Sequence, residues 1–343
     1  MSETSSGGGS GAASGAANGG ASANGKRSPS AKRHASRSGF VPPAPATVDL
    51  HTHTLRSDGI LTPLELVTAV AATGVTLLAI TDHDTLAGVR ELRASGATPS
   101  GLEILPGIEI NTVVQDRDHI AEGEVHILGL GVDPDDDALE AALSSQRDAR
   151  RTRFDRMVAK LRDLGMPIEE ALEQLPATTD EDALGRPRIA RALILTGQAE
   201  SVEDAFSRHL SRGRPAYVPR EGLGPREAIG AVRAAGGIAS LAHYSEAAAH
   251  MEFMRSLVDL GLNGLEVHYR SYDLSTVRLM QSIATDLRLV ETGGTDYHGD
   301  RETYAEAHAQ LWNPPEIADG VRAGLVGARP ARRPATATSA APG

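Results

Sequence analysis

DLHTHTLRSDG, residues 49–59, contains the turn from a short apolar run into a polar loop. His51 and His53 are two positions apart, so in an extended segment both imidazoles point to the same side. Two imidazoles on one face can share a metal ion. A single His-x-His pair occurs more often as surface or packed histidines, so its meaning depends on what the rest of the chain places beside it.

Short apolar runs recur along the chain and alternate with helical segments. They are residues 48–50, 76–81, 102–110, 125–131, 237–242, 264–267 and 287–291. This alternation predicts parallel strands with crossover helices, and seven strands suit a barrel better than a two-layer sheet. The first helix has clear boundaries, since Thr62 can cap it, Pro63 fits the first turn, Glu65 completes a capping box and Gly74 ends it.

The strand pattern disappears between Asp133 and Val218, where helical segments take its place. We therefore predict an α/β fold: a distorted (β/α)7 barrel formed by residues 47–133 and 219–327, with a helical cap inserted at 134–218. The Arg-rich run at 147–156 is interpreted as a solvated helix face, with a substrate-facing patch as the alternative. Of the first 40 residues, 27 are Gly, Ser or Ala, so tails at 1–46 and 328–343 are predicted to be disordered.

Composition excludes several classes of protein. The 343 residues include no Cys, which rules out thiolate metal sites, cysteine nucleophiles and disulfides. Aromatic residues make up only 3%, which argues against base-stacking platforms. The formal net charge of −11 argues against stable binding of duplex nucleic acid. No apolar run approaches the ~18 residues of a membrane span, so we expect a cytoplasmic protein without membrane contact; the oligomeric state is not predicted.

Nearly every predicted strand has an imidazole or carboxylate at or near its end. Besides DLHTHTLRSDG, the motifs are TDHD (81–84), PGIE (106–109), His126, AH (242–243) and TDYH (295–298). In a parallel barrel these ends meet at one rim. Arg56 is the only Lys or Arg within these motifs, so cations must offset most of the negative charge of the cluster. Imidazole and carboxylate ligands suit Zn, Mn or Fe, and up to nine ligands imply two or three divalent ions.

This ordered set of motifs resembles the PHP (polymerase and histidinol phosphatase) family over about residues 47–312. The resemblance implies a trinuclear metal site with nine ligands. The first ion would take His51, His53, Glu109 and Asp296; the second Asp58, His83 and His298; and the third Glu109, His126 and His243, with Glu109 as a bridge. Asp296 and His298 are thereby also predicted to act in catalysis.

Within that family, the helical insert followed by GRP (185–187) and AYVP (216–219) resembles the nucleoside 3′,5′-bisphosphate phosphatases and 5′–3′ exoribonucleases on short RNA. The expected function is metal-dependent hydrolysis of nucleotide phosphomonoesters. Arg186 is predicted to bind substrate phosphate, and so is Arg188, which stands where the branch usually has His. Tyr244 is a second departure, because the branch usually has Pro there.

Further roles and competing functions follow from the same residues. Asp84 is predicted to act in catalysis, either by orienting a ligand imidazole or by protonating the leaving oxygen, and Asp82 has the same two interpretations. His268 is interpreted as a packed or surface histidine. The competing functions are a histidinol-phosphatase-like or other small-molecule phosphatase, a metallohydrolase of another bond such as an amide, and a non-catalytic metal-stabilised module.

Overall fold

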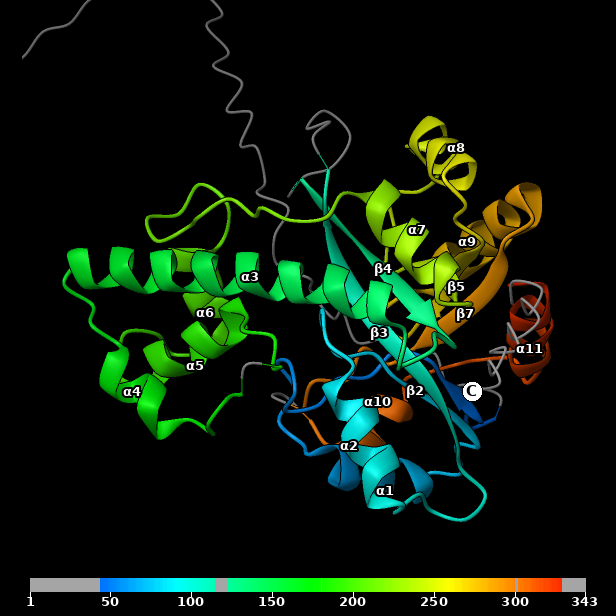
Figure 1. The fold of residues 1–343 in the computed structure, drawn as a ribbon, viewed down its shortest axis with the longest axis horizontal. Coiled ribbons are helices and arrows are strands. Elements are labelled where there is room, and N and C mark those ends of the chain that lie inside the picture. The colour runs from blue at the N-terminus through cyan, green and yellow to red at the C-terminus, as the bar shows by residue number, and fades with distance from the viewer. Residues whose placement is uncertain (1–43, 115–122, 180, 300–301, 329–343) are drawn as a thin grey trace, which may run out of the picture.

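The computed structural model describes residues 44–114, 123–179, 181–299 and 302–328 (Figure 1). Within them, seven strands form one sheet whose order follows the chain. The strands are β1 (Val48–Asp49), β2 (Leu77–Ile80), β3 (Glu103–Val113), β4 (Glu124–Leu130), β5 (Ile238–Leu241), β6 (Gly264–Tyr269) and β7 (Val290–Gly294). Each predicted run overlaps one of them. The seven-stranded α/β barrel predicted from the sequence is confirmed.

The prediction that all strands are parallel is wrong for one of them. β4 pairs antiparallel with both β3 and β5, whereas all other neighbours are parallel. The physical reason is the connection that precedes it, because residues 114–123 are too few for a crossover helix and a hairpin forces the strand to reverse. The beginning of β4, rather than its end, therefore lies beside the end of β3, and this brings His126 opposite Asn111.

The barrel closes where the chain leaves β1 and β7. The Leu50 amide donates to the Gly293 carbonyl, the Asp296 amide donates to the His51 carbonyl, and Thr52 forms an isolated parallel bridge with Tyr297. Gly294 permits this approach, since a Cβ there would lie 2.4 Å from the His51 Cβ and 2.6 Å from its backbone nitrogen. The closure therefore joins the two loops that carry His51 and Asp296.

Helices cover the outside of the barrel. They are α1 (Pro63–Ala71), α2 (Ala87–Ser95), α7 (Pro225–Ala234), α8 (Met251–Asp259), α9 (Leu274–Leu287), α10 (Tyr304–His308) and α11 (Glu316–Ala328). The predicted capping box of α1 is present between Thr62 and Glu65. Ile317 and Val321 of α11 pack with residues from the starts of β1, β2 and β5, so α11 covers the end of the barrel opposite the strand-end motifs.

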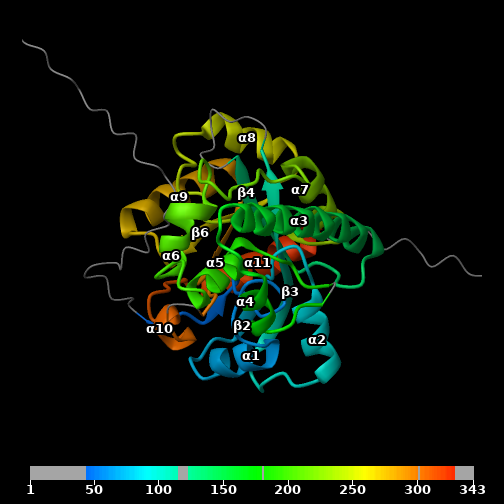
Figure 2. The ribbon, with the colours of Figure 1, turned by 90° about the vertical axis from the view of Figure 1, so that its left-hand side faces the viewer.

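The segment between β4 and β5 begins with α3 (Asp137–Asp163), the longest helix in the described residues. After it come α4 (Glu169–Gln174), α5 (Arg186–Leu195), α6 (Val202–Ala205) and the π-helix η1 (Phe206–Leu210). Figure 1 shows these short helices beside the far half of α3, and Figure 2 shows α4, α5 and α6 in front of the barrel. We call this helical part the cap.

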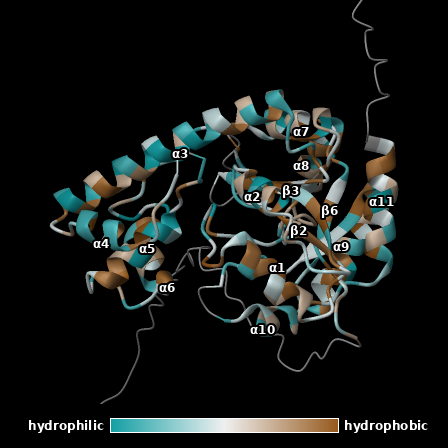
Figure 3. Ribbon diagram, turned by 60° about the horizontal axis from the view of Figure 1, so that its bottom comes forward, coloured by the Kyte–Doolittle hydropathy of each residue, from teal (hydrophilic) through white to brown (hydrophobic). Residues whose placement is uncertain are grey.

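The cap and the barrel each have a hydrophobic cluster, and α3 belongs to both. Leu139 and Leu143 of α3 join the barrel cluster, whereas Phe154, Met157 and Leu161 join the cap cluster. Figure 3 shows hydrophobic segments, in brown, within the cap helices α5 and α6. No helix in the described ranges is long and apolar enough to cross a membrane. Most of the two tails predicted to be disordered, residues 1–43 and 329–343, lies outside the described residues.

Candidate metal centre

The nine predicted metal ligands meet at one rim of the barrel. His51, His53 and Asp58 follow β1, and His83 follows β2. The remaining five come from the other strands of the rim: Glu109 in β3, His126 near the start of β4, His243 after β5, and Asp296 and His298 after β7. Every one of these side chains is buried or half-buried. The reversed direction of β4 is what allows His126 to take part.

The side chains form three groups, and within each group the potential ligand atoms lie within 4.8 Å of one another. The groups are His53, Asp58, His83 and His298; His51, His53, Glu109 and Asp296; and Glu109, His126 and His243. They coincide with the three predicted ligand sets, except that His53 also joins the group of Asp58. Each of the three groups therefore has the side chains to hold a metal ion.

Glu109 lies at the centre of the site and faces two groups at once. Its Oε2 lies 3.0 Å from His83 Nδ1 and 3.2 Å from His53 Nε2. Its Oε1 lies 2.7 Å from His126 Nδ1 and 3.1 Å from His243 Nε2. A carboxylate with one oxygen in each group has the placement that a bridging ligand requires.

Unsatisfied polar atoms show that these residues fit metal ions. His51 Nε2, both ring nitrogens of His53 and Glu109 Oε2 are buried without a hydrogen-bond partner. Buried polar atoms are normally hydrogen-bonded, so several orphaned atoms at one point call for another partner. A divalent ion is such a partner for imidazole and carboxylate ligands.

The pKa shifts of the cluster also reflect how closely its imidazoles and carboxylates are packed. Burial favours the neutral form of each group, but neighbouring opposite charges outweigh it at most positions. They raise the pKa of His53 to about 10, through Asp296 and Glu109, and that of His51 well above its ordinary value. They hold the pKa of Asp58 and Glu109 well below the usual range, chiefly through His83. His83 itself is the exception, since burial lowers its pKa to about 4.

The backbone is strained where it delivers these residues. Four non-glycine residues in the described ranges have positive φ, and three of them are Asp84 (53°), His243 (33°) and Asp296 (50°). All three lie within four residues of a strand end at the rim. Left-handed conformations are unfavourable for residues with a Cβ and concentrate at functional sites, where the surrounding structure holds them.

Comparison with known proteins identifies the family. A family model described as PHP domain matches residues 49–176. A 3′,5′-nucleoside bisphosphate phosphatase from Chromobacterium violaceum is 33% identical over 264 residues, which cover 75% of this chain and 89% of that protein. This chain belongs to the PHP family. A 5′–3′ exoribonuclease from Haemophilus influenzae is 34% identical, with 73% of this chain and 89% of that protein covered.

A solved structure with the same fold supports this. A protein from Bifidobacterium adolescentis, described as a metal-dependent phosphoesterase, superposes with a TM-score of 0.71 at 31% identity. The match covers 83% of this chain and 99% of that protein. Membership of this family makes the chain an enzyme of the metal-dependent phosphoesterase class, and the His, Asp and Glu groups of its PHP barrel are able to bind metal ions.

Residues that the sequence interpretation missed hold the ligands of the PHP site in place. Glu266 in β6 is fully buried; its Oε1 lies 3.0 Å from His51 Nδ1, and its Oε2 accepts the His243 backbone N–H at 2.7 Å. Tyr269 in β6 donates to Asp296 at 3.1 Å. The sequence signal for this role was Glu266 itself, a charged residue within an apolar run. A buried strand tolerates such a carboxylate only if it has a hydrogen-bond partner.

Asp82 and Asp84 have different surroundings, although they flank the same histidine. Asp82 accepts hydrogen bonds from the Thr54 amide and hydroxyl, both at 2.7 Å, and from Ser57 at 2.9 Å, so it orders the loop that leads to Asp58. Asp84 accepts a hydrogen bond from Arg150 at 2.7 Å. The structure thus directs Asp84 toward α3, and a role for it as an acid stays a prediction.

The interpretation of residues 147–156 as a solvated helix face is wrong for part of the run. The Arg150 and Arg153 side chains are each only 7% exposed. Arg150 donates to the Leu184 carbonyl as well as to Asp84, and Arg153 donates to the Val218 carbonyl. Helical spacing places positions 150 and 153 on one face, and that face packs between the cap and the barrel rather than in water.

The two predicted phosphate-binding residues are placed differently. Arg186 donates to Glu124 at 3.0 Å, beside the start of β4. Arg188 donates to the carbonyls of Pro176 and Leu172, so it holds the end of α4, and a phosphate contact from it would require those bonds to break. Among the other residues considered from sequence, Tyr244 hydrogen-bonds to His250. His268 is buried against Trp312 and lies 3.1 Å from Glu291, as expected for a packed residue.

Proposed function

We propose that this PHP enzyme hydrolyses the 3′-phosphate of nucleoside 3′,5′-bisphosphates, releasing the nucleoside 5′-monophosphate and phosphate, and that it also degrades short RNA from the 5′ end. The observation that carries the proposal is the Glu109-centred cluster, which has the ligands of a phosphoesterase metal centre. The choice of substrate is supported by the relatives named as a bisphosphate phosphatase and an exoribonuclease, each covered over 89% of its length.

We assign two or three divalent ions, of Mn, Zn or Fe, to the three residue groups. When bound, such ions acidify water and polarise phosphoryl oxygens, which is the chemistry that phosphate ester hydrolysis needs. Asp296 and His298 contribute to catalysis as ligands, since each belongs to one of the groups.

The chain's own residues prepare the site for phosphate. The start of α5 lies over the cluster, because a Cβ on Gly185 would be 3.7 Å from Asp58 Oδ2 and 3.2 Å from Arg150 Nη2. A side chain at 185 would therefore occupy the space above the ligands. Arg150 is held in this position by Asp84 and the Leu184 carbonyl, so a guanidinium of the kind that binds phosphate oxygens lies close to the start of α5.

The competing functions have weaker support. Barrel enzymes that hydrolyse amides often place a carbamylated Lys between their metals, and none of the seven described strands contains Lys. A non-catalytic module would have lost ligands, whereas all nine positions hold a metal-binding side chain. A histidinol-phosphatase-like activity uses the same centre, so only substrate choice separates it from the proposed function.

The test is release of phosphate and nucleotide by the Mn-loaded protein from three substrates in parallel: adenosine 3′,5′-bisphosphate, a short 5′-phosphorylated RNA and histidinol phosphate. We expect adenosine 5′-monophosphate and phosphate from the first, and stepwise nucleotide release from the second. Turnover of histidinol phosphate alone would contradict the proposal. A Glu109→Gln protein serves as the inactive control, since it loses the bridging carboxylate.

A further inference from the structure

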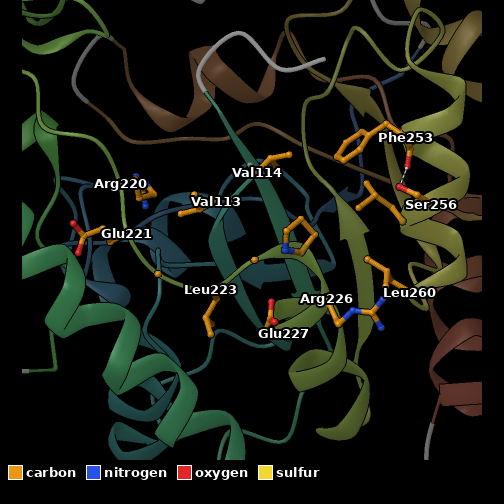
Figure 4. Close-up of a pocket in the computed structure, with 14 residues that line it drawn as sticks. Val113, Val114, Arg220, Glu221, Leu223, Arg226, Glu227, Phe253, Ser256 and Leu260 are labelled. Atoms are coloured by element: carbon orange, nitrogen blue, oxygen red, sulfur yellow. Dashed lines mark hydrogen bonds between the residues drawn. The ribbon is translucent and has the colours of Figure 1, made fainter. Parts of the chain in front are cut away.

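Two contacts across the seam between the cap and the barrel differ in what they reach. The segment that returns from the cap to α7 is anchored on β3, where the Val113 amide donates to the Leu223 carbonyl at 2.8 Å. Beside it lies a groove of about 760 Å³ between the end of β3, the start of α7 and α8 (Figure 4). None of the nine predicted metal ligands lines this groove. The other contact, made by residues 181–191 of the cap, reaches the loop that carries Asp58.

Residues 181–191 hold the backbone of this loop just before the metal ligand. The Ala183 amide donates to the Arg56 carbonyl at 3.1 Å. The Arg56 side chain in turn lies 3.4 Å from the buried carboxylate of Asp182. The cap segment and the barrel loop are therefore joined by both a backbone hydrogen bond and an ion pair, two positions before Asp58.

Arg191 of α5 contacts the ligand residue itself. Its Nη2 donates to the backbone carbonyl of Asp58 at 2.6 Å. A hydrogen bond from a charged donor is roughly twice as strong as one between neutral groups. The carbonyl and the carboxylate belong to the same residue, so this bond fixes the backbone from which the carboxylate extends.

The barrel holds the same loop on either side of Asp58. Before it, the Ser57 hydroxyl donates to Asp82 at 2.9 Å. After it, the Ile60 amide donates to the His298 carbonyl at 3.0 Å. The carbonyl of Asp58 between these two points is held from the cap, by the arginine of α5. The position of this one ligand therefore depends on the cap as well as on the barrel.

Asp58 matters most to one of the three ligand groups. Its Oδ1 lies 3.2 Å from His298 Nε2 and 3.7 Å from His53 Nδ1, and its Oδ2 lies 3.5 Å from His83 Nε2. We call these four residues the Asp58 group. Asp58 is its only carboxylate, whereas both other groups contain Glu109, which lies within β3. A shift of Asp58 would therefore remove the anionic ligand of the Asp58 group and leave that of the other two in place.

We propose that Arg191 is a positioning residue for Asp58, so that contact of the cap with the barrel and binding of a divalent ion in the Asp58 group are coupled. The inference rests on the proposed assignment of metal ions and is independent of the choice of substrate. Such coupling is reciprocal. Arg191 holds Asp58 in place for the ion, and an ion on the carboxylate holds Asp58 in place for Arg191.

The first test is a titration of the metal-free, full-length protein with Mn²⁺, in which free Mn²⁺ is followed by electron paramagnetic resonance. Arg191→Met removes the donor and keeps an unbranched side chain. We expect one Mn²⁺ site to weaken about tenfold, at the lower end of the effect of residues that support metal ligands, while the others keep their affinity. Unchanged affinity at every site, or equal weakening of all sites, would overturn the positioning role.

A matched control and a double variant show whether Arg191 acts through Asp58. Lys160→Met also removes a charged donor to a backbone carbonyl, since Lys160 of α3 donates to the Tyr217 carbonyl at 2.9 Å, and it should bind Mn²⁺ as the wild type does. In an Asp58→Ala protein, Arg191→Met should cause no further loss of Mn²⁺ affinity. A second tenfold loss in that background would contradict the inference.

Hydrogen exchange tests the reciprocal effect in the wild-type protein, without relying on a variant that folds. Exchange is followed by mass spectrometry with and without Zn²⁺. We expect the ion to slow exchange in residues 181–191, which include the Ala183 amide, more than in α4, whose Ala171 packs in the cap cluster. Equal changes in both segments of a metal-loaded protein would refute the coupling. Absence of bound metal would instead overturn the metal assignment in the proposed function.

Discussion

Glu266 offers the sharpest test of how the barrel holds its metal ligands. Its two carboxylate oxygens serve different ligand groups, since Oε1 faces His51 Nδ1 and Oε2 accepts the His243 backbone N–H. Glu266→Gln keeps the size of the side chain but leaves one acceptor oxygen. One of two buried donors then loses its partner, at a free-energy cost of about 1–3 kcal/mol. Mutating a residue that hydrogen-bonds to a metal-binding histidine typically weakens metal affinity about 10- to 100-fold.

The measurement is metal affinity by competition with a chelator, using Mn²⁺ and Zn²⁺, together with the thermal midpoint of the metal-free protein. We expect Glu266→Gln to weaken metal binding by about 10- to 100-fold. Glu291→Gln is the matched control, because Glu291 also pairs with a buried histidine, His268, outside the metal groups. Unchanged metal affinity in a folded Glu266→Gln protein would refute the positioning role.

Three further predictions concern stability. Gly294→Ala should destabilise the protein by about 1–3 kcal/mol in urea unfolding, because the new Cβ would overlap His51. The control Gly230→Ala has open space around the new Cβ and should be neutral or stabilising. Equal effects of the two substitutions on stability would contradict the argument. Chelation should lower the thermal midpoint by roughly 4–6 °C, since ligand at 100 times its Kd contributes about 2.7 kcal/mol. An unchanged midpoint would mean that no metal is bound. Despite partial burial, Arg147 and Arg90 hold the pKa of Glu140 below its ordinary value of 4.5. The ionised Glu140 therefore stabilises the folded protein above pH 4.5, and this stabilisation is lost as the pH falls further. In urea titrations, the free energies of unfolding of the wild type and Glu140→Gln should become equal in acid.

Much of the fold could be predicted from the sequence because hydrophobic periodicity and capping signals are local. The capping box at Thr62 and the helical character of the segment that begins after Asp133 are examples. The direction of β4 could not be predicted in this way, since an apolar run has the same pattern in either direction. The start of β7 was placed too early, because Leu287 ends α9 with the same apolar character that a strand has.

The candidate site was predictable as far as its ligands occur in short motifs at strand ends. The residues that hold these ligands in place could not be predicted, because their roles depend on contacts between segments that are distant in the sequence. Glu266 meets His51 across 215 positions of the sequence, and Arg150 meets Asp84 across 66. The run of arginines on α3 has the composition of a solvated surface, and only the packing of the cap shows which of them are buried.

The continuity of α3 has a consequence for the dynamics of the molecule. At 1.5 Å per residue its 27 residues extend for about 40 Å, and one end packs in the barrel while the other packs in the cap. No loop interrupts the helix at the seam, so the backbone has no hinge there. Opening of the cap must bend or unfold part of α3, and the amide hydrogens in the middle of this helix should therefore exchange with solvent together with those of both clusters, as one cooperative unit.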